Sequence, residues 1–130
     1  MAAYTVSEIA ELFAVSPDTV RRWISSGKLS AGVGEHGRQV VDGAELALWA
    51  QEQAPPSLTS TESSSARNRA RGLVTRIVKD TVMAQVDLQC GPYRFVSLMS
   101  AEAVESLRLE VGDVADAVVK ATTVIVERAK

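Results

Sequence analysis

The sequence is poor in the residues that build covalent or metal cross-links. It contains one cysteine, Cys90, and one histidine, His36. A single cysteine excludes a disulfide within the chain, and one cysteine with one histidine leaves no cluster at metal-ligand spacing. We therefore expect no direct ligands for a metal cation, a half-buried thiol at Cys90 and a surface position for His36.

Aromatic residues, long apolar runs and excess positive charge are also scarce. Aromatic side chains make up 5% of the chain, which leaves few large anchors for a core. No stretch approaches the roughly 20 apolar residues that span a bilayer, and no basic segment followed by an apolar run opens the chain. We therefore expect a cytoplasmic protein with no membrane partner. The net charge of −2 argues against a strongly basic nucleic-acid binder, because phosphate contacts dominate DNA affinity.

A stretch rich in proline, serine and threonine divides the chain of 130 residues. Residues 55–64 lack helical and strand periodicity, which is typical of a flexible linker. Before it, apolar residues recur at helical spacing; after it, they alternate as in strands. One face of that alternation holds Val82, Ala84, Val86 and Leu88, and the other holds Met83, Gln85, Asp87 and Gln89. We predict an α+β protein with a mostly helical domain at residues 1–54 and a β-rich domain at residues 65–130. Domains this small are marginally stable alone, which favours oligomerisation.

Two capped helices are predicted in the first half. Thr5 and Glu8 form a capping box, and Ser16 followed by Pro17 marks a second helix start. The second helix turns short hydrogen-bonding side chains and two arginines away from its apolar face: Thr19, Arg21, Arg22 and Ser25. The pattern favours a helix-turn-helix, although an ordinary helical hairpin has the same periodicity.

The strings Tyr4–Ala10, Val15–Trp23 and Gly27–Leu29 closely resemble the winged helix-turn-helix of the MerR and excisionase-like families, over roughly the first 50 residues. The resemblance implies that the second helix enters the DNA major groove while the first braces it. DNA is therefore an expected partner, and the expected DNA-binding residues are Ser16, Thr19, Arg21, Arg22, Lys28 and Arg38.

The resemblance also places a β-hairpin wing at residues 32–41, where glycines permit a tight turn. Glu35 stands in this wing where a basic residue is expected. Asp42 and Glu45 predict a second capping box at the start of a third helix. The first half has four lysines and arginines against seven aspartates and glutamates, so its intrinsic DNA affinity should be weak. Two linked copies would offset that weakness.

The second half is predicted to be a small five-stranded β-barrel with one short helix. Turns are expected at Lys79–Asp80 and Gly91–Pro92, the helix near residues 101–107, and two further strands that end at Val126. This order is typical of oligonucleotide-binding-like (OB-like) barrels, in which closure removes exposed strand edges. Fold class alone does not identify a ligand.

Two short motifs in this half are more specific: Ser65–Asn68 before the first strand and Lys120–Val124 between the last two. Together they resemble the Mop or TOBE family, over nearly all of residues 65–130. The resemblance implies molybdate or tungstate as the ligand, bound at subunit interfaces of a homo-oligomer, a dimer or a hexamer, with no organic cofactor. The expected oxyanion-binding residues are Ser65, Ala66, Arg67, Asn68, Ser97, Ser100, Lys120, Ala121 and Thr122.

The residue types in these motifs suit a tetrahedral dianion, whose acceptor oxygens need convergent donors and partial charge neutralisation. Arg67 and Lys120 supply charge, serine and threonine hydroxyls donate, and a tight turn at Ala121 directs backbone N–H groups. Taken singly, each cation is also explained as a solvated surface charge. Molybdate, tungstate and sulfate share shape and charge, so the choice among them rests on pocket size.

Three functions are open at this point. The first is a DNA-binding transcriptional regulator that responds to molybdate or tungstate, in which the anion sets the geometry of the oligomer. The second is a storage or buffering protein in which the helical domain at residues 1–54, here called the head, serves assembly. The negative net charge of the head favours this second function. An enzyme is the weakest, because no nucleophile–base pair, carboxylate pair, phosphate loop or metal cluster occurs at useful spacing. We therefore expect no enzymatic activity.

Overall fold

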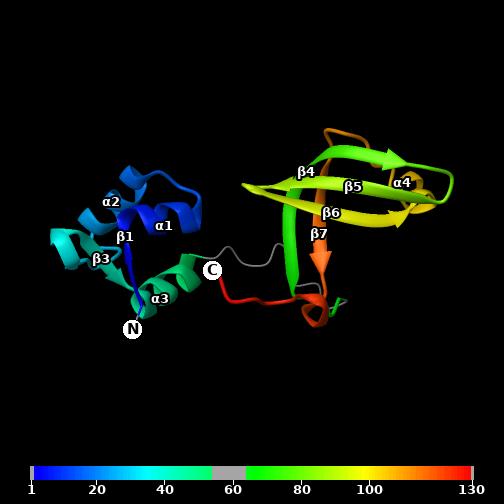
Figure 1. The fold of residues 1–130 in the computed structure, drawn as a ribbon. Coiled ribbons are helices and arrows are strands. Elements are labelled where there is room, and N and C mark those ends of the chain that lie inside the picture. Colours follow the sequence, from blue (N-terminus) through cyan, green and yellow to red (C-terminus); the bar gives the residue numbers. More distant parts are fainter. Residues whose placement is uncertain (1, 54–63, 130) are drawn as a thin grey trace. The chain divides into compact units, whose positions relative to one another are not determined.

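The computed structural model describes residues 2–53 and 64–129 (Figure 1). The chain divides into two compact units, Met1–Pro55 and Pro56–Lys130. The predicted linker, residues 55–64, lies outside the described residues apart from Ser64. No helix in the described ranges is long and apolar enough to cross a membrane.

The first unit combines three α-helices with a small antiparallel sheet. Its elements are β1 (Ala3–Thr5), α1 (Val6–Phe13), α2 (Pro17–Ser25), β2 (Gly32–Val33), the 3-10 helix η1 (Glu35–Gly37), β3 (Gln39–Asp42) and α3 (Gly43–Gln53). The strand order is β1-β3-β2. The β2–β3 hairpin occupies the segment in which a wing was expected.

The helix starts follow the predicted caps. The Thr5 amide donates to Glu8 Oε1 at 3.0 Å and the Glu8 amide donates to Thr5 Oγ1 at 3.3 Å, which confirms the first capping box. Ser16 Oγ accepts from the Thr19 amide at 3.2 Å and caps α2. Between the two helices Ala14 adopts a left-handed conformation, with φ of 54°, that turns the chain sharply.

One apolar cluster fixes the two helices against the sheet and α3. Its buried members are Ile9, Ala10, Val20, Leu29, Val41 and Leu46. Phe13, Trp23 and Trp49 pack around it, with Trp23 and Trp49 ring centroids 4.5 Å apart. Because α2 buries its apolar side in this cluster, its polar side faces outward, as predicted.

The start of α3 differs from the prediction. The Glu45 amide donates to Asp42 Oδ2 at 3.2 Å, as a capping box requires. The Glu45 carboxylate, however, accepts from the Ser30 amide at 2.8 Å. The predicted bond from the Asp42 amide to the Glu45 carboxylate is therefore wrong. The Glu45 carboxylate binds the loop after α2 instead, and this bond ties that loop to α3.

The second unit is a strongly curled four-stranded sheet (Figure 1). Its elements are β4 (Asn68–Lys79), β5 (Met83–Cys90), β6 (Tyr93–Ser100), α4 (Ala101–Ser106), β7 (Val114–Val119) and the 3-10 helix η2 (Ala121–Thr123). All neighbours in the order β6-β5-β4-β7 are antiparallel. The inward face forms a second core, with Val74, Ala84, Val86, Leu88, Cys90 and Val104 buried.

The turns and the helix of this unit lie where the sequence predicts them, but the sheet of residues 64–129 has four strands and not five. The last apolar segment, Val124–Val126, forms no strand, and Ile125 and Val126 are 85% and 89% exposed. Figure 1 shows this segment leaving the sheet after η2. An alternating apolar pattern predicts a strand, but a strand also needs a neighbour to pair with.

Gly72 allows β4 to approach β5 closely. A Cβ atom added at residue 72 would lie 2.6 Å from Cys90 Sγ and 2.6 Å from the Gln89 carbonyl oxygen. The second contact is with backbone, so a side chain at this position requires the two strands to shift.

We expect Gly72→Ala to lower the free energy of unfolding of the second unit by about 1–3 kcal/mol, the usual cost of overpacking. Urea unfolding followed by far-ultraviolet circular dichroism measures this change. Both tryptophans, Trp23 and Trp49, lie in the first unit, so their fluorescence transition is an internal control that should not move. An unchanged circular dichroism transition would contradict the close approach.

Candidate functional sites

The ladder between β4 and β7 brings the two motifs of the second unit together. Asn68 pairs with Val119, and Asn68 Nδ2 donates to the Val119 carbonyl at 3.1 Å across 51 positions of sequence. The residues before Asn68 and those after Val119 therefore leave the ladder at the same end. Arg67 and Lys120 are the first residues beyond it on either strand.

The segment after β7 is a tight turn with unused donors. The amide and the hydroxyl of Thr123 both donate to the Lys120 carbonyl, at 2.9 and 2.8 Å. As the first residues of η2, Ala121 and Thr122 have no acceptor within the turn for their N–H groups. These two amides, the Thr122 hydroxyl and the Lys120 ammonium are all on exposed residues.

The segment before β4 adds a second cation. Arg67 is exposed, and its guanidinium makes one long contact of 3.5 Å with the Ser64 carbonyl. The Ala66 amide donates to Ser64 Oγ at 3.2 Å, and the Ser65 side chain is exposed. Within one chain these donors form an open half-site, with cations and hydroxyls but no wall that excludes water.

Arg69 lies beside this half-site and was not among the predicted ligands. With Arg67, Asn68 and Phe95 it lines a hollow of about 210 Å³. Its Nε is buried and has no hydrogen-bond partner among the described residues. The signal was present in the sequence, because Arg69 belongs to the basic run Arg67, Arg69 and Arg71 that continues from the predicted motif into β4.

Arg71 is withdrawn from ligand binding by an ion pair. Its Nε and a terminal nitrogen lie 3.0 and 3.5 Å from the Asp116 carboxylate, across β4 and β7. This hydrogen bond is the main reason that the pKa of Asp116 lies below its ordinary value. Asp116 thereby neutralises Arg71 and holds β7 against β4.

The predicted ligands on β6 are not brought to the same place in one chain. Ser100 Oγ accepts from the Ala103 amide at 3.0 Å and caps α4. Ser100 pairs with Met83, whose neighbour Ala84 pairs with Lys79, so Ser100 lies at the opposite end of β4 from Asn68. Ser97 lines the groove between β6 and β7.

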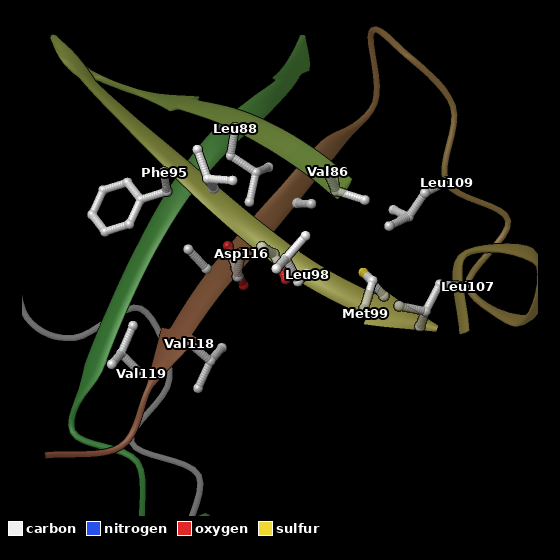
Figure 2. A pocket seen from close by; sticks show the side chains of 14 residues that line it. Val86, Leu88, Phe95, Leu98, Met99, Leu107, Leu109, Asp116, Val118 and Val119 are labelled. Atoms are coloured by element: carbon white, nitrogen blue, oxygen red, sulfur yellow. The ribbon is translucent and has the colours of Figure 1, made fainter. Parts of the chain in front are cut away.

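That groove has a volume of about 700 Å³ and is mostly apolar (Figure 2). Its lining includes Phe95, Leu98, Met99, Leu107, Leu109 and Val118. In the described part of the chain, β6 pairs only with β5 and β7 pairs only with β4. The groove is therefore bordered by two strand edges whose backbone groups lack strand partners.

The first unit has two hollows, and each is lined by different members of the predicted DNA-binding set. One, of about 350 Å³, is lined by Thr19, Arg22, Trp23, Ser25, Ser26 and Lys28. The other, of about 330 Å³, is lined by Thr5, Val6, Ser7, Arg21, Arg38 and Gln39. Arg21 and Arg22 are adjacent in sequence but about 100° apart around α2, so they serve different hollows.

The contacts of the two arginines also differ. Arg22 lies 3.4 Å from Thr19 Oγ1, a weak contact that leaves its guanidinium available. Arg21 forms an ion pair of 2.7 Å with Asp18. Ser16 acts as the cap of α2, with its hydroxyl 2.9 Å from that of Thr19.

The Arg71–Asp116 pair gives a pH dependence whose sign follows from the lowered pKa of Asp116. A carboxyl with a lower pKa in the folded protein stabilises the fold above its unfolded value of about 3.9, and that stability is lost as the pH falls through the folded pKa. We expect Asp116→Asn to lower the urea midpoint at pH 7, with a deficit that shrinks as the pH falls below the unfolded value of about 3.9. A deficit of the same size at pH 7 and at the acidic pH would show that the ionised pair is not responsible.

Comparison with known proteins identifies both halves. Residues 3–54 match a helix-turn-helix domain family, and residues 64–126 match the TOBE domain family. A molybdate-binding protein from Sporomusa ovata is 35% identical, with a TM-score of 0.50 over 51% of this chain and 98% of that chain. MopII from Clostridium pasteurianum is 37% identical, with a TM-score of 0.48 over 51% of this chain and 100% of that one. No curated protein matches the chain.

Proposed function

We propose that this chain, which belongs to the TOBE family through residues 64–126 and carries a helix-turn-helix domain at residues 3–54, is a DNA-binding transcriptional regulator that responds to molybdate or tungstate. The observation that carries the proposal is that Arg67 and Lys120 directly follow the last pair of the β4–β7 ladder, Asn68 with Val119. The similarity to a molybdate-binding protein supports the choice of anion.

The charge and donor balance of the half-site suits a tetrahedral dianion. Two cations, Arg67 and Lys120, match its two negative charges, while the Ser65 and Thr122 hydroxyls and the amides of the turn supply hydrogen bonds. Asp116 neutralises the neighbouring Arg71, so that arginine does not add a further positive charge to the site. Arg69 is a further candidate ligand.

We propose that a second copy of the chain completes the site. The donors of one chain are exposed, and Ser100 lies at the opposite end of β4 from them. In a homo-oligomer, Ser97 and Ser100 of one copy would reach the Arg67 and Lys120 of another. The smallest such assembly is a dimer, and a hexamer would contain three dimers.

The groove between β6 and β7 supports this assembly. It leaves two strand edges open beside an apolar interior, and within residues 64–129 the exposed apolar segment Val124–Val126 pairs with no strand. A segment from another copy would fill the groove, satisfy the edges and bury its own side chains. The fifth strand predicted from the sequence would then be supplied between chains.

The head supports a DNA-reading role within that oligomer. Thr19, Arg22 and Lys28 border one hollow on the exposed side of α2, where a helix in the major groove would present them to base edges. The β2–β3 hairpin occupies the place of a MerR-like wing, which we include in the proposal. The cytoplasmic location expected from the sequence is also part of the proposal.

Isothermal titration with molybdate tests the anion site. We expect Arg67→Gln and Lys120→Gln each to weaken binding by about 10- to 100-fold, the usual cost of losing a charge-assisted hydrogen bond. Arg76→Gln is the matched control, because Arg76 is an exposed arginine on β4, far along the strand from Asn68. Equal losses in all three variants would argue against a defined site.

Sedimentation analysis tests the role of the last apolar segment. We expect Ile125→Asp combined with Val126→Asp to convert the oligomer to monomer, because charged side chains oppose burial in an apolar groove. Arg128→Ala, a change in the same exposed tail, should leave the oligomer intact. If the double variant assembles as the unaltered chain does, the segment does not fill the groove.

Selection of sites from a random duplex library, with and without molybdate, tests the regulatory role. We expect discrete sequences to be enriched, their affinity to change across a molybdate titration, and Arg22→Gln to reduce the preference for them. The acidic head, with its net charge of −3, favours the competing storage function. Tight anion binding without enriched sequences would support storage, and discrete sites insensitive to molybdate would reject the coupling.

A further inference from the structure

Arg69 is the middle member of three arginines around the start of β4, and it differs from the other two in its contacts. Arg71 is bound to Asp116 at 3.0 Å, and Arg67 lies beyond the ladder in the anion half-site. Arg69 forms no ion pair within the described residues, and its buried Nε has no hydrogen-bond partner there. A buried donor without an acceptor costs free energy, so a carboxylate supplied from another chain would stabilise this guanidinium.

Arg69 also borders the groove between β6 and β7. It pairs with Val118, which lines the groove, and the hollow that Arg69 lines shares Phe95 with the groove. Ala70 and Ala117 form the next pair of the ladder and pack against the core. Because side chains alternate along a strand, Arg69 and Val118 lie on the outer side of the sheet, at the rim of the groove.

The exposed tail after η2 contains one acidic residue. Its sequence from Val124 is Val-Ile-Val-Glu-Arg-Ala-Lys, so Glu127 directly follows the apolar segment. Glu127 is exposed and forms no ion pair within the described residues. A carboxylate is costly to bury in an apolar groove. A tail that pairs with β7 would therefore turn Val124 and Val126 into the groove and Glu127 toward the outer side, where Arg69 lies.

We infer that Glu127 of one copy of the chain forms an ion pair with Arg69 of a second copy, at the rim of the groove that receives the apolar tail. A tail strand beside β7 lies two strand spacings, about 10 Å, from β4, and two long side chains span that distance over Val118. The pair rests on the oligomer proposed above and deepens that proposal, because it names a bond between the copies. It also gives the buried Nε of Arg69 an acceptor.

This ion pair would fix the register of the added strand. An apolar segment in an apolar groove can slip along its length, whereas a charged pair holds one alignment. Lys120 lies seven positions before Glu127 in the same tail. A bond between Glu127 and Arg69 therefore also sets where the Lys120 turn of one copy lies along the sheet of the other.

Charge reversal at the two positions, followed by sedimentation of the full chain over a dilution series without molybdate, tests the pair. We expect Arg69→Glu and Glu127→Arg each to weaken assembly by about 10-fold or more, because each brings two like charges together. In an equimolar mixture of the two variants, each chain offers the opposite charge to the other. Mixed oligomers should therefore form with nearly the affinity of the unaltered chain, a recovery that misfolded chains could not give.

Arg128→Glu is the matched control, since it reverses the next charge in the same tail. Mixed with Arg69→Glu, it should restore nothing. Recovery when both reversals are in one chain, without recovery in the mixture, would place the pair within a chain and contradict the contact between copies. An Arg69→Glu chain that assembles normally but binds molybdate weakly would show that Arg69 is an anion ligand, and would also overturn the pair.

The same measurements separate the ion pair from the assembly on which it rests. If the unaltered chain is monomeric at every concentration, the proposed assembly and the ion pair are both wrong. If Ile125→Asp combined with Val126→Asp gives a monomer while the Arg69 and Glu127 variants assemble as the unaltered chain does, the tail fills the groove and only the ion pair is wrong.

Discussion

The antiparallel ladder between β4 and β7 is the contact on which the proposed anion site depends. It joins two segments that lie 51 positions apart, ends with Asn68 bound to the Val119 carbonyl, and is held at mid-length by the Arg71–Asp116 pair. Because both motifs begin at its last rung, their cations share one end of the sheet. A shift of register by one residue would place alternate side chains on the opposite face and separate the donors.

In the described residues of a single chain, the sheet is not closed into a barrel. β7 has a partner on one side only, the turn at η2 carries the following apolar residues away from the sheet, and the groove up to β6 stays open. An OB-like barrel normally removes such edges by closure. In the proposed oligomer, closure of the sheet and completion of the anion site follow from the same assembly. The acidic first unit would gain DNA affinity from that assembly as well.

Much of the fold could be predicted from local sequence signals, because caps and turns depend on residues that are neighbours in the chain. Thr5 with Glu8, Ser16 before Pro17, and the turn at Gly91–Pro92 appear where predicted. Alternation also identified the inward face of β5, including Val86 and Leu88.

Features that depend on partners far away in the sequence could not be predicted. Glu45 binds the Ser30 amide, which no local rule could anticipate. Asp87 belongs to the polar face of β5, yet it is only 4% exposed, because Gln85 and Arg94 cover it and bind its carboxylate. These bonds, with Gln85 first, keep the pKa of Asp87 below its ordinary value. The different settings of Arg21 and Arg22 likewise depend on where the β2–β3 hairpin lies.

Native mass spectrometry with and without molybdate tests most directly whether the anion site is completed between copies of the chain. We expect an oligomer with an even number of chains that gains a fixed number of molybdate ions, while any monomer in the same spectrum carries none. A monomer that binds molybdate as well as the oligomer does, or an oligomer that binds none, would contradict it.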